Sequence, residues 1–393
     1  MRLLFVLLLG LGLTLPAAAQ QPTPADPDVL LQGFYWNVHP GDAAQNNDGI
    51  WWDSLRTHAQ TFVDAGVQTI WLPSPFKGLA GRWSMGYDIY DYYDLGAFEN
   101  KFTRRTRFGT VEEFQAKMGE FDRVGLRKMV DAVLNHRDGA AAQSRVDCWY
   151  GAGQGPLRFN VFNPNSGRFP ATARNFHPNG DECNEDAPYN DPVFAQDQAY
   201  FTDLNTTLDP GAPNGGWFYG PHRLGFNADS LVAWGRYLFD DLEFDEVRVD
   251  AIKHIDPAFL APWLVEVRDG SQPYAVGEFF GSNPEIQNYI GQVNRFNSSF
   301  PEPGAPGRDA NLAGFDFGLR FALKDMANSG GFYDMRNLNS VGLHFNGVDP
   351  FRVATFVDNH DFDRIGYVGA DCNAPDAIRI GHTCLKISID SGH

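Results

Sequence analysis

The sequence has few basic residues for its acidic content. Its 393 residues include 31 Lys and Arg against 49 Asp and Glu, which gives a formal net charge of −18 at pH 7. Because a nucleic-acid partner requires a basic face that neutralises phosphates, this balance argues against nucleic-acid binding. Aromatic residues make up 14% of the chain, more than a disordered, highly charged chain contains. The composition is therefore that of a globular protein.

Long apolar runs are also scarce. The run Leu3–Leu15 follows Arg2 and precedes the small residues Ala17–Ala19. It is shorter than the ~20 residues that a membrane-spanning helix needs. The order charged, apolar, small is typical of a cleaved secretory signal rather than a membrane anchor. We therefore expect residues 1–19 to be a signal peptide and the mature protein to be secreted, extracellular or periplasmic, without a membrane anchor.

Cysteine is rare, with four residues in the chain, and none lies in the C-x-x-C pattern of zinc or redox sites. In an exported protein an even number of cysteines suggests two disulfides, for which three pairings are possible. Shorter loops lose less entropy on closure, which favours Cys148–Cys183 and Cys372–Cys384. Free buried thiols are the alternative.

Several catalytic motifs are missing. The sequence has no H-E-x-x-H pattern and no cluster of His, which argues against a metallohydrolase. The glycine-rich stretch Gly151–Gly155 follows no predicted strand and opens no predicted helix, so it does not have the context of a nucleotide-binding loop.

Apolar runs typical of strands alternate with amphipathic helical segments. Thr110 and Glu113 form a capping box at the start of one helix, and Gly125 is its expected end. The predicted strands are Val29–Trp36, Val67–Leu72, Lys128–Leu134, Asp245–Asp250, Pro273–Glu278 and Val353–Asp358. This alternation predicts parallel βαβ units and hence an α/β fold, a (β/α)8 TIM-type barrel, with a doubly wound open sheet as the alternative.

Residues 137–205 interrupt this alternation. They show no clear period, are rich in Gly, Pro and Asn, and contain two of the cysteines. Because a structureless loop of this length is uncommon in a compact domain, we expect a small inserted subdomain after the third strand. It divides the barrel into residues 20–136 and 206–361, and residues 362–393 form a short C-terminal segment.

Three predicted strands lead into carboxylates. Alternation along a strand puts Arg248 and Asp250 on one face, where the guanidinium is expected to keep the carboxylate ionised. Glu278 ends another strand among apolar residues, an environment that suits a general acid, and Asp361 follows a third strand. Strand ends converge on one face of a (β/α)8 barrel, where two carboxylates can cleave a glycosidic bond. The alternative, that each acid only caps a helix, is weaker for three acids together than for one.

The segments around these acids, with two others, form a set with a fixed order: Met85–Gly96, Asp131–His136, Glu246–His254, Ala275–Glu278 and Phe356–Asp361. The last four resemble the four signature regions of the alpha-amylase family of glycoside hydrolases, and the first resembles the segment after that family's second strand. The resemblance covers residues from about 29 to 361. It implies a monomeric, retaining glycoside hydrolase that cleaves α-1,4-glucosidic bonds within starch- or glycogen-like polysaccharides.

The resemblance also implies roles for individual residues. Asp250 is expected to be the nucleophile, Glu278 the acid/base and Asp361 the stabiliser of the transition state. Residues expected to bind substrate are Tyr87, His136, Arg248, Lys253, His254 and His360. Among these, Arg248 would orient the nucleophile, the histidines next to strand ends would bind sugar hydroxyls, and Tyr87 would stack on a sugar face.

Acidic residues are plentiful in the inserted region, but they match no EF-hand, and an acidic loop alone is usually a solvated surface. The resemblance implies a Ca²⁺ ion. Its ligands would be Asn135, Asp197, Asp203 and the backbone carbonyl of His254. Such an ion would connect the inserted subdomain to the barrel and shape the cleft without taking part in bond cleavage.

The region after Asp361 departs from the family. The family continues with an eighth βα unit and a β-rich C-terminal domain, which we expect this chain to lack. A barrel without its eighth strand leaves the first and seventh strands with unpaired edges. Two alternative functions therefore stay open: a catalytically impaired α-glucan-binding homologue, and an α-glucan transglycosylase that passes the glycosyl-enzyme to a sugar acceptor.

Overall fold

The computed structural model describes residues 28–36, 38–41, 50–147, 154–172, 202–203, 228–267, 273–298, 310–362, 379–380 and 383–384. The expected signal peptide, the proposed ligand Asp197 and three of the four cysteines lie outside these ranges, so export and disulfide pairing stay predictions. Within them, no helix is long and apolar enough to span a bilayer.

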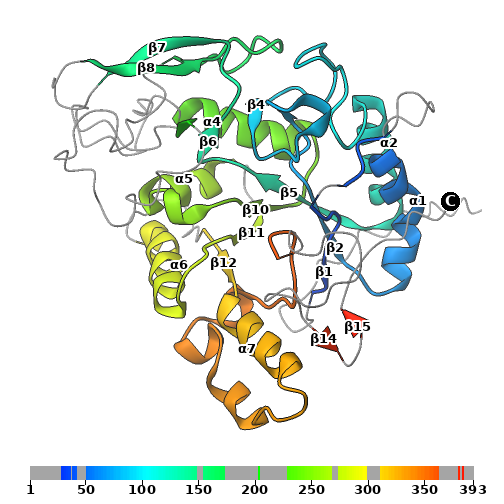
Figure 1. Ribbon diagram of the computed structural model, residues 1–393, viewed down its shortest axis with the longest axis vertical. Coiled ribbons are helices and arrows are strands. Elements are labelled where there is room, and N and C mark those ends of the chain that lie inside the picture. The colour runs from blue at the N-terminus through cyan, green and yellow to red at the C-terminus, as the bar shows by residue number, and fades with distance from the viewer. Residues whose placement is uncertain are drawn as a thin grey trace, which may run out of the picture.

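Seven parallel strands form one sheet in the described part of the chain (Figure 1). They are β1 (Leu30–Gln32), β2 (Thr69–Leu72), β5 (Arg127–Ala132), β10 (Glu246–Val249), β11 (Tyr274–Gly277), β12 (Leu312–Phe315) and β13 (Val353–Ala354). Each strand pairs in parallel with the next one in the chain. A doubly wound sheet reverses its strand order at a switch point, and this sheet does not. The sheet is therefore singly wound, as in a (β/α)8 barrel.

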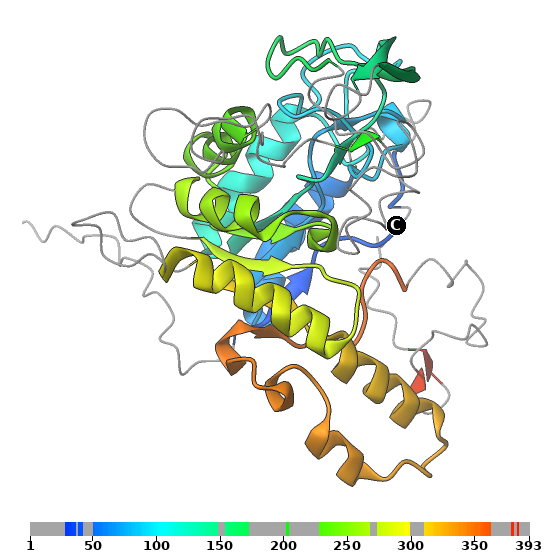
Figure 2. The same cartoon turned by 90° about the vertical axis from the view of Figure 1, so that its left-hand side faces the viewer.

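In the described ranges, one helix follows each of the first six strands of this sheet. These helices are α1 (Ile50–Asp64), α2 (Val111–Val124), α4 (Ala228–Arg236), α5 (Pro257–Glu266), α6 (Asn283–Ser298) and α7 (Phe317–Asn328). Figures 1 and 2 show them in succession around the sheet, from α1 and α2 through α4, α5 and α6 to α7. This arrangement confirms the predicted alternation of strands and helices.

Helix α2 shows how local sequence sets these boundaries. The Thr110 hydroxyl accepts a bond from the amide of Glu113, whose carboxylate accepts one from the amide of Thr110 at 2.8 Å. At the other end Gly125 adopts a left-handed conformation with φ of 76°, which glycine reaches without strain. Phe114 and Phe121 on the buried face anchor the helix to the core. The capping box and the glycine stop predicted from the sequence are confirmed.

The sheet curves so that distant strands face each other. The ring centroid of Trp71 on β2 lies 5.7 Å from that of Phe315 on β12. In a flat sheet four strand spacings would hold these rings roughly 19 Å apart. The backbone amide of His360, beyond β13, also donates to the Gln32 side-chain oxygen of β1 at 3.3 Å. The two ends of the sheet therefore approach each other around a filled interior.

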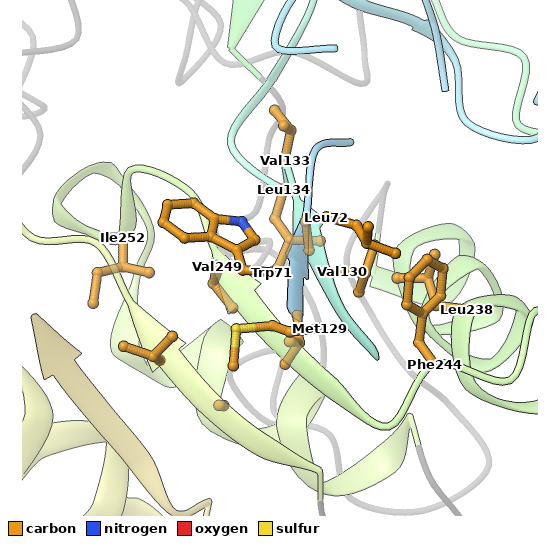
Figure 3. Close-up of a cluster of buried hydrophobic side chains, with 14 of the residues drawn as sticks. Trp71, Leu72, Met129, Val130, Val133, Leu134, Leu238, Phe244, Val249 and Ile252 are labelled. Carbon is orange, nitrogen blue, oxygen red and sulfur yellow. The ribbon is translucent and has the colours of Figure 1, made fainter. Parts of the chain in front are cut away.

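Apolar side chains from neighbouring strands pack together and fix the register. Figure 3 shows Leu72 and Val130, from β2 and β5, beside Leu238 and Phe244, while Trp71 of β2 points away from these two. All five side chains are buried. Burial of each side chain of this kind contributes about 1.5–3 kcal/mol, so a slipped register would be strongly destabilised.

The described parts of the inserted region are antiparallel. Strand β6 (His136–Arg137) pairs with β9 (Thr202–Asp203), and β7 (Ala142–Asp147) pairs with β8 (Gln154–Val161). The β6–β9 pair joins the beginning and the end of the region. The buried Arg137 donates to the carbonyl oxygens of Tyr90 and Phe169 at 2.6 and 2.8 Å, which attaches this base to the connection after β2.

Short elements complete the described structure. They are β3 (Lys77–Gly78), β4 (Ile89–Asp91), β14 (Arg379–Ile380), β15 (Thr383–Cys384), the 3-10 turns η2 (Gly81–Trp83), η7 (Ile252–His254), η8 (Met335–Ser340), η9 (His344–Asn346) and η10 (Pro350–Arg352), and the π-helical turn η6 (Tyr237–Asp241). The last strand of the large sheet, β13, is much shorter than the predicted Val353–Asp358, because only β12 pairs with it among the described residues.

Candidate active site

The guanidinium of Arg248, on β10, lies at the centre of three carboxylates. Its Nη1 donates to Asp131 Oδ1 at 2.6 Å and to Asp250 Oδ1 at 2.7 Å. Its Nη2 donates to Glu278 Oε2 at 2.7 Å. The Arg248 side chain is only 1% exposed, so these bonds form away from water. The structure thus brings Arg248, Asp250 and Glu278 into direct contact.

Strand register explains this meeting. Arg248 on β10 lies beside Asp131 on β5, and neighbouring residues in parallel strands point to the same face. Asp250 shares that face with Arg248 because it lies two residues further along. Val249 pairs with Gly277 on β11. The next residues in the two strands, Asp250 and Glu278, therefore lie at the same height along the sheet.

The turn after Asp250 holds Glu278 in place. Ala251 has a φ of 46°, a left-handed conformation that is rare for residues other than glycine and is found often at functional sites. Its amide donates to Glu278 Oε2 at 3.2 Å, and the amide of Ile252 donates to the Glu278 carbonyl at 2.9 Å. A Cβ on Gly277 would lie 2.4 Å from Ile252 Cδ1, so this close approach requires glycine.

Tyr87 and His360 join the cluster through Asp131. The Tyr87 hydroxyl donates to Asp131 Oδ2 at 2.7 Å and lies 2.9 Å from His360 Nε2. The two rings are stacked, with centroids 5.3 Å apart, and the ring of Trp36 lies 6.0 Å from each. Trp71 Nε1 also donates to Asp131, at 3.0 Å. Two aromatic residues that the sequence analysis did not select, Trp36 and Trp71, are therefore part of the cluster.

His136 and Asn135 lie behind Tyr87. His136 Nε2 donates to the Tyr87 carbonyl oxygen at 2.8 Å, and its Nδ1 lies 3.4 Å from Asn135 Nδ2. His136 is buried, so in this structure it orients the backbone that carries Tyr87. The expected bond from His136 to a sugar hydroxyl stays a prediction.

The remaining expected residues lie at the periphery of the cluster. Asp361 is partly exposed, with Oδ1 at 3.7 Å from His360 Nε2, so it reaches the cluster through that histidine. Lys253 and His254 lie on η7, directly after the turn at Ala251. Lys253 Nζ is 5.9 Å from the ring centroid of Phe279, the residue after Glu278.

Burial, and not only Arg248, sets the charge state of Asp250. Burial raises the pKa of Asp250 well above its ordinary value, and the opposing effect of Arg248 is smaller. The neighbouring Glu278 and Asp131 raise the pKa of Asp250 further, since three carboxylates share one cation. The expected effect of Arg248, which lowers the pKa of Asp250, has the predicted direction, but burial outweighs it and the net shift is upward. The sequence pattern had paired Arg248 with one acid instead of three.

Two neighbours of this acid have shifted pKa values for the same reasons. Burial, followed by the charge of Asp131, raises the pKa of Tyr87 well above its usual range, so its hydroxyl stays protonated and donates. Burial lowers the pKa of Arg248, but the three carboxylates raise it more, and the guanidinium stays charged.

The proposed calcium ligands are only partly placed. Asn135 is buried between β5 and β6. The β6–β9 pairing sets Asp203 opposite His136, which follows Asn135 in the chain. His254 lies on η7, and Asp197 lies outside the described ranges. No three acidic, His or Cys side chains cluster as a metal site among the residues that the structure describes. The donors expected here, an amide, a backbone carbonyl and carboxylates, are hard oxygen ligands, which Ca²⁺ prefers.

Sequence comparison finds relatives over most of the chain. A glucan 1,4-alpha-maltohexaosidase from Bacillus sp. (strain 707) is 28% identical over 85% of this chain and 63% of its own length. An alpha-amylase from Bacillus licheniformis is 27% identical over 91% of this chain and 68% of its own length. A cytoplasmic alpha-amylase from Escherichia coli is 26% identical, covering 85% and 66%. The chain thus spans about two thirds of the length of these relatives, and no protein-family model matches it.

Solved structures share the fold. A cyclomaltodextrin glucanotransferase with a three-domain ABC distribution superposes with a TM-score of 0.55 at 16% identity, over 84% of this chain and 64% of that chain. A mutant of alpha-amylase I from Eisenia fetida in complex with maltohexaose superposes with a TM-score of 0.52 at 16% identity, covering 86% and 59%. These likenesses agree with the singly wound, curved sheet described above.

Proposed function

Because the chain is a homologue of the alpha-amylase family of glycoside hydrolases, we propose that it is a retaining hydrolase of α-1,4-glucosidic bonds within starch- or glycogen-like polysaccharides. One observation carries this proposal: Asp250 and Glu278 each lie 2.7 Å from the same guanidinium. A retaining mechanism needs two carboxyl groups about 5 Å apart, and bonds to the two Nη atoms of one guanidinium keep these carboxyl groups close to each other.

In this mechanism the two acids act in sequence. Glu278 protonates the glycosidic oxygen while Asp250 attacks the anomeric carbon, which gives a glycosyl-enzyme and frees the leaving sugar. Glu278 then removes a proton from water while the water oxygen attacks the anomeric carbon, which breaks its bond to Asp250 and releases the second product. Asp361 stabilises the positive charge that develops on the sugar ring. Arg248 and the amide of Ala251 hold the two acids in place, as their bonds of 2.7 and 3.2 Å support.

Substrate binding follows from the aromatic rings around the acids. Tyr87, stacked on His360, offers a flat surface for the apolar face of a sugar, and His360 and His136 serve the hydroxyls. Lys253 and His254, beyond the nucleophile on η7, serve sugars on the leaving-group side. Relatives named for maltohexaose, as product or as bound ligand, support an α-glucan as the substrate.

A calcium ion held by Asn135, Asp197, Asp203 and the carbonyl of His254 belongs to the same proposal. The base of the inserted region, where β6 pairs with β9, lies directly after Asn135, which supports a ligand set shared by the barrel and the insertion. The ion would supply cross-links between these segments. Chelation should therefore lower the midpoint of thermal unfolding, and added Ca²⁺ should restore it.

Two alternative functions and the location of the enzyme need direct tests. Transglycosylation is one alternative, because a glucanotransferase shares the fold, and an impaired glucan-binding homologue is the other. For location we propose secretion, as a monomer, on the strength of residues 1–19, although one relative is named as cytoplasmic.

The decisive experiment follows reducing ends released from soluble starch, with and without a calcium chelator. The wild-type protein should release them, and Glu278→Gln should lower turnover at least roughly a hundredfold without loss of folding, the scale of general acid catalysis. Products longer than a maltotetraose substrate would identify a transglycosylase instead. A folded wild type that releases no sugar, or an active Glu278→Gln variant, would refute the proposal.

A further inference from the structure

Trp71, on β2, lies next to the acids but has no role in the mechanism proposed above. Its side chain is buried, and the register of the sheet turns it to the inner face. Trp71 pairs with Met129, two residues before Asp131. Asp131 in turn pairs with Arg248, so these side chains share one face. Figure 3 shows the ring of Trp71 pointing away from Phe244. The ring therefore lies under the charges that Arg248 and the acids form.

The indole N–H of Trp71 completes the hydrogen bonding of Asp131. Asp131 Oδ2 accepts from Trp71 Nε1 at 3.0 Å and from the Tyr87 hydroxyl at 2.7 Å. Asp131 Oδ1 accepts from Arg248 Nη1 at 2.6 Å. The Asp131 side chain is 0% exposed, so these three donors take the place of water around its charge. Hydrogen bonds to the charged form of an acid favour that form.

The ring of Trp71 contacts two further groups of the site. Its centroid lies 5.0 Å from Arg248 Cζ, within the range of a cation–π contact. It lies 5.5 Å from the ring centroid of His360, with the two planes at 75°. Phe34 and Phe315 hold the indole in turn, with ring centroids at 5.4 and 5.7 Å. Because these two neighbours fix its orientation, Trp71 can fix the groups that it contacts.

Two other buried tryptophans differ from Trp71 in what their indole N–H meets. Trp263 Nε1 donates to the carbonyl oxygen of Leu231 at 2.9 Å. In the described part of the chain, Trp52 Nε1 has no hydrogen-bond partner. A backbone carbonyl does not titrate, whereas a carboxylate does. The hydrogen bond of Trp71 therefore depends on pH, and that of Trp263 does not.

We propose that Trp71 is a positioning residue of the active site: its indole N–H holds Asp131 as an anion, and its ring supports the guanidinium of Arg248. Arg248 Nη1 is shared between Asp131 and Asp250. An Asp131 that has donors of its own draws less on this guanidinium, which leaves more of it for Asp250 and Glu278. The consequence for catalysis rests on the proposed function, but the hold on Asp131 does not.

The charged and titratable groups around Asp131 come from several elements. They are Arg248 on β10 with Asp250 after it, Glu278 after β11, Tyr87 before β4 and His360 beyond β13. Burial raises the pKa of Asp131, and the charge of Arg248 opposes the rise. Removing the Trp71 N–H takes away another donor that favours the charged form, so the pKa of Asp131 in the folded protein should rise further. A higher folded-state pKa of an acid costs stability at high pH and none at low pH, so the loss should grow as pH rises.

Urea unfolding at pH 4 and pH 8 tests this hold on Asp131. Trp71→Phe should lower the urea midpoint at both pH values, and the loss should be roughly twofold larger at pH 8, because hydrogen bonds to charged acceptors are that much stronger than bonds to neutral ones. Trp263→Phe is the matched control, since it also removes a buried indole with one hydrogen bond, but the acceptor is a carbonyl. Its loss should be the same at both pH values. In the Asp131→Asn background, the pH dependence of Trp71→Phe should disappear.

The indole N–H resonances of the wild type give a second measurement, which does not need a stable Trp71 variant. In a proton–nitrogen correlation spectrum, the Trp71 signal should move with pH as Asp131 titrates, and the Trp263 signal should stay in place. A Trp71 signal that does not move, or an equal loss of the urea midpoint at both pH values, would overturn the inference and make Trp71 a packing residue only.

The consequence for catalysis has its own readout, the acid limb of the pH profile of kcat/KM. Trp71→Phe should move this limb to lower pH, by less than Asp131→Asn does, because an Asp131 that is protonated more of the time raises the pKa of Asp250 less. Trp263→Phe should leave the limb in place, and a limb at higher pH in Trp71→Phe would contradict the proposal. Failure of the wild type to hydrolyse any α-glucan would refute the proposed function alone, because neither unfolding nor the indole resonances need turnover.

Discussion

The molecule buries two cations in opposite ways. Arg248 is surrounded by three carboxylates, all within 2.7 Å of its guanidinium. Lys117, on α2, is fully buried with Nζ 4.1 Å from the ring centroid of Trp52 and 4.3 Å from that of Phe114. In the described part of the chain, Lys117 Nζ has no hydrogen-bond partner. One cation therefore has an excess of negative charge around it, and the other has aromatic rings.

The difference follows from what each side chain can do with its proton. A guanidinium cannot lose its charge in a protein, so burying Arg248 requires anions. An amine can, and burial, with a smaller effect of Lys128, lowers the pKa of Lys117 well below its usual range. Burial raises the pKa of Asp131 and of Asp250, and the charge of Arg248 opposes that rise. Lys117 has no carboxylate around it, and burial among aromatic rings disfavours its charged form.

The largest effect should come from removing the shared cation. Arg248→Met leaves Asp131, Asp250 and Glu278 buried without it, and breaking buried ion pairs in this way costs about 3–5 kcal/mol. It should lower the free energy of unfolding by that amount near neutral pH and abolish hydrolysis. Loss of the cation raises the pKa of Asp131 and Asp250 in the folded state, so the destabilisation should grow as pH rises and shrink toward pH 4. Urea unfolding at pH 5 and pH 8 measures the loss of unfolding free energy and its dependence on pH.

Arg248→Lys is the control for this prediction. It keeps the charge but loses the planar fork that reaches three acids, so it should recover part of the stability and little of the activity. An equal loss of stability for Arg248→Met at both pH values would mean that the acids are not coupled to this cation.

A change of opposite sign is expected at the other buried cation. Lys117→Met keeps the volume and removes an amine whose charged form burial disfavours, so it should stabilise the protein at neutral pH. The gain should be at least about 1.4 kcal/mol, the value of one pKa unit. Because the pKa is lowered in the folded state, wild-type stability rises with pH up to the unfolded-state value near 10.5. The advantage of Lys117→Met should therefore narrow as pH approaches 10.

The matched control is Lys128→Met. Lys128 is also buried, but its Nζ contacts Asp122 and lies 3.7 Å from Asp245, so its removal should destabilise the protein. If Lys117→Met and Lys128→Met changed the urea midpoint in the same direction, the contrast between paired and unpaired cations would not hold.

How much of the fold could be predicted from the sequence depends on whether an element is set by local or by distant interactions. Helix α2 was predicted with both ends because Thr110, Glu113 and Gly125 act within a few residues of one another. Strand β12 was missed, since Leu312–Phe315 has four residues, one of them Gly314, and too few to show a period. Strand β1 was predicted too long, as Val29–Trp36, because its apolar residues beyond Gln32 leave the sheet toward the site.

The candidate site divides in the same way. Arg248 and Asp250 were paired correctly because alternation along one strand places them on one face. Asp131 was not selected, because its contact with Arg248 depends on the register of β5 against β10, which one strand alone does not show. The error in the charge state of Asp250 has the same origin, since the acids that raise its pKa come from two other strands.

The smallest predicted effect comes from Asp131→Asn, and it tests how far Asp131 raises the pKa of Asp250. The nucleophile acts as an anion, so kcat/KM should fall on the acid side as Asp250, with its raised pKa, takes up a proton. Asp131→Asn removes one carboxylate that raises this pKa and leaves Arg248 to the other two. The acid limb should then move to lower pH by on the order of one unit, the scale of such like-charge effects. Glu112→Gln, an exposed acid on α2, should leave the limb in place. If the acid limb of kcat/KM in Asp131→Asn stayed at the same pH or moved to higher pH, Asp131 would not raise the pKa of Asp250 by competing with it for the guanidinium.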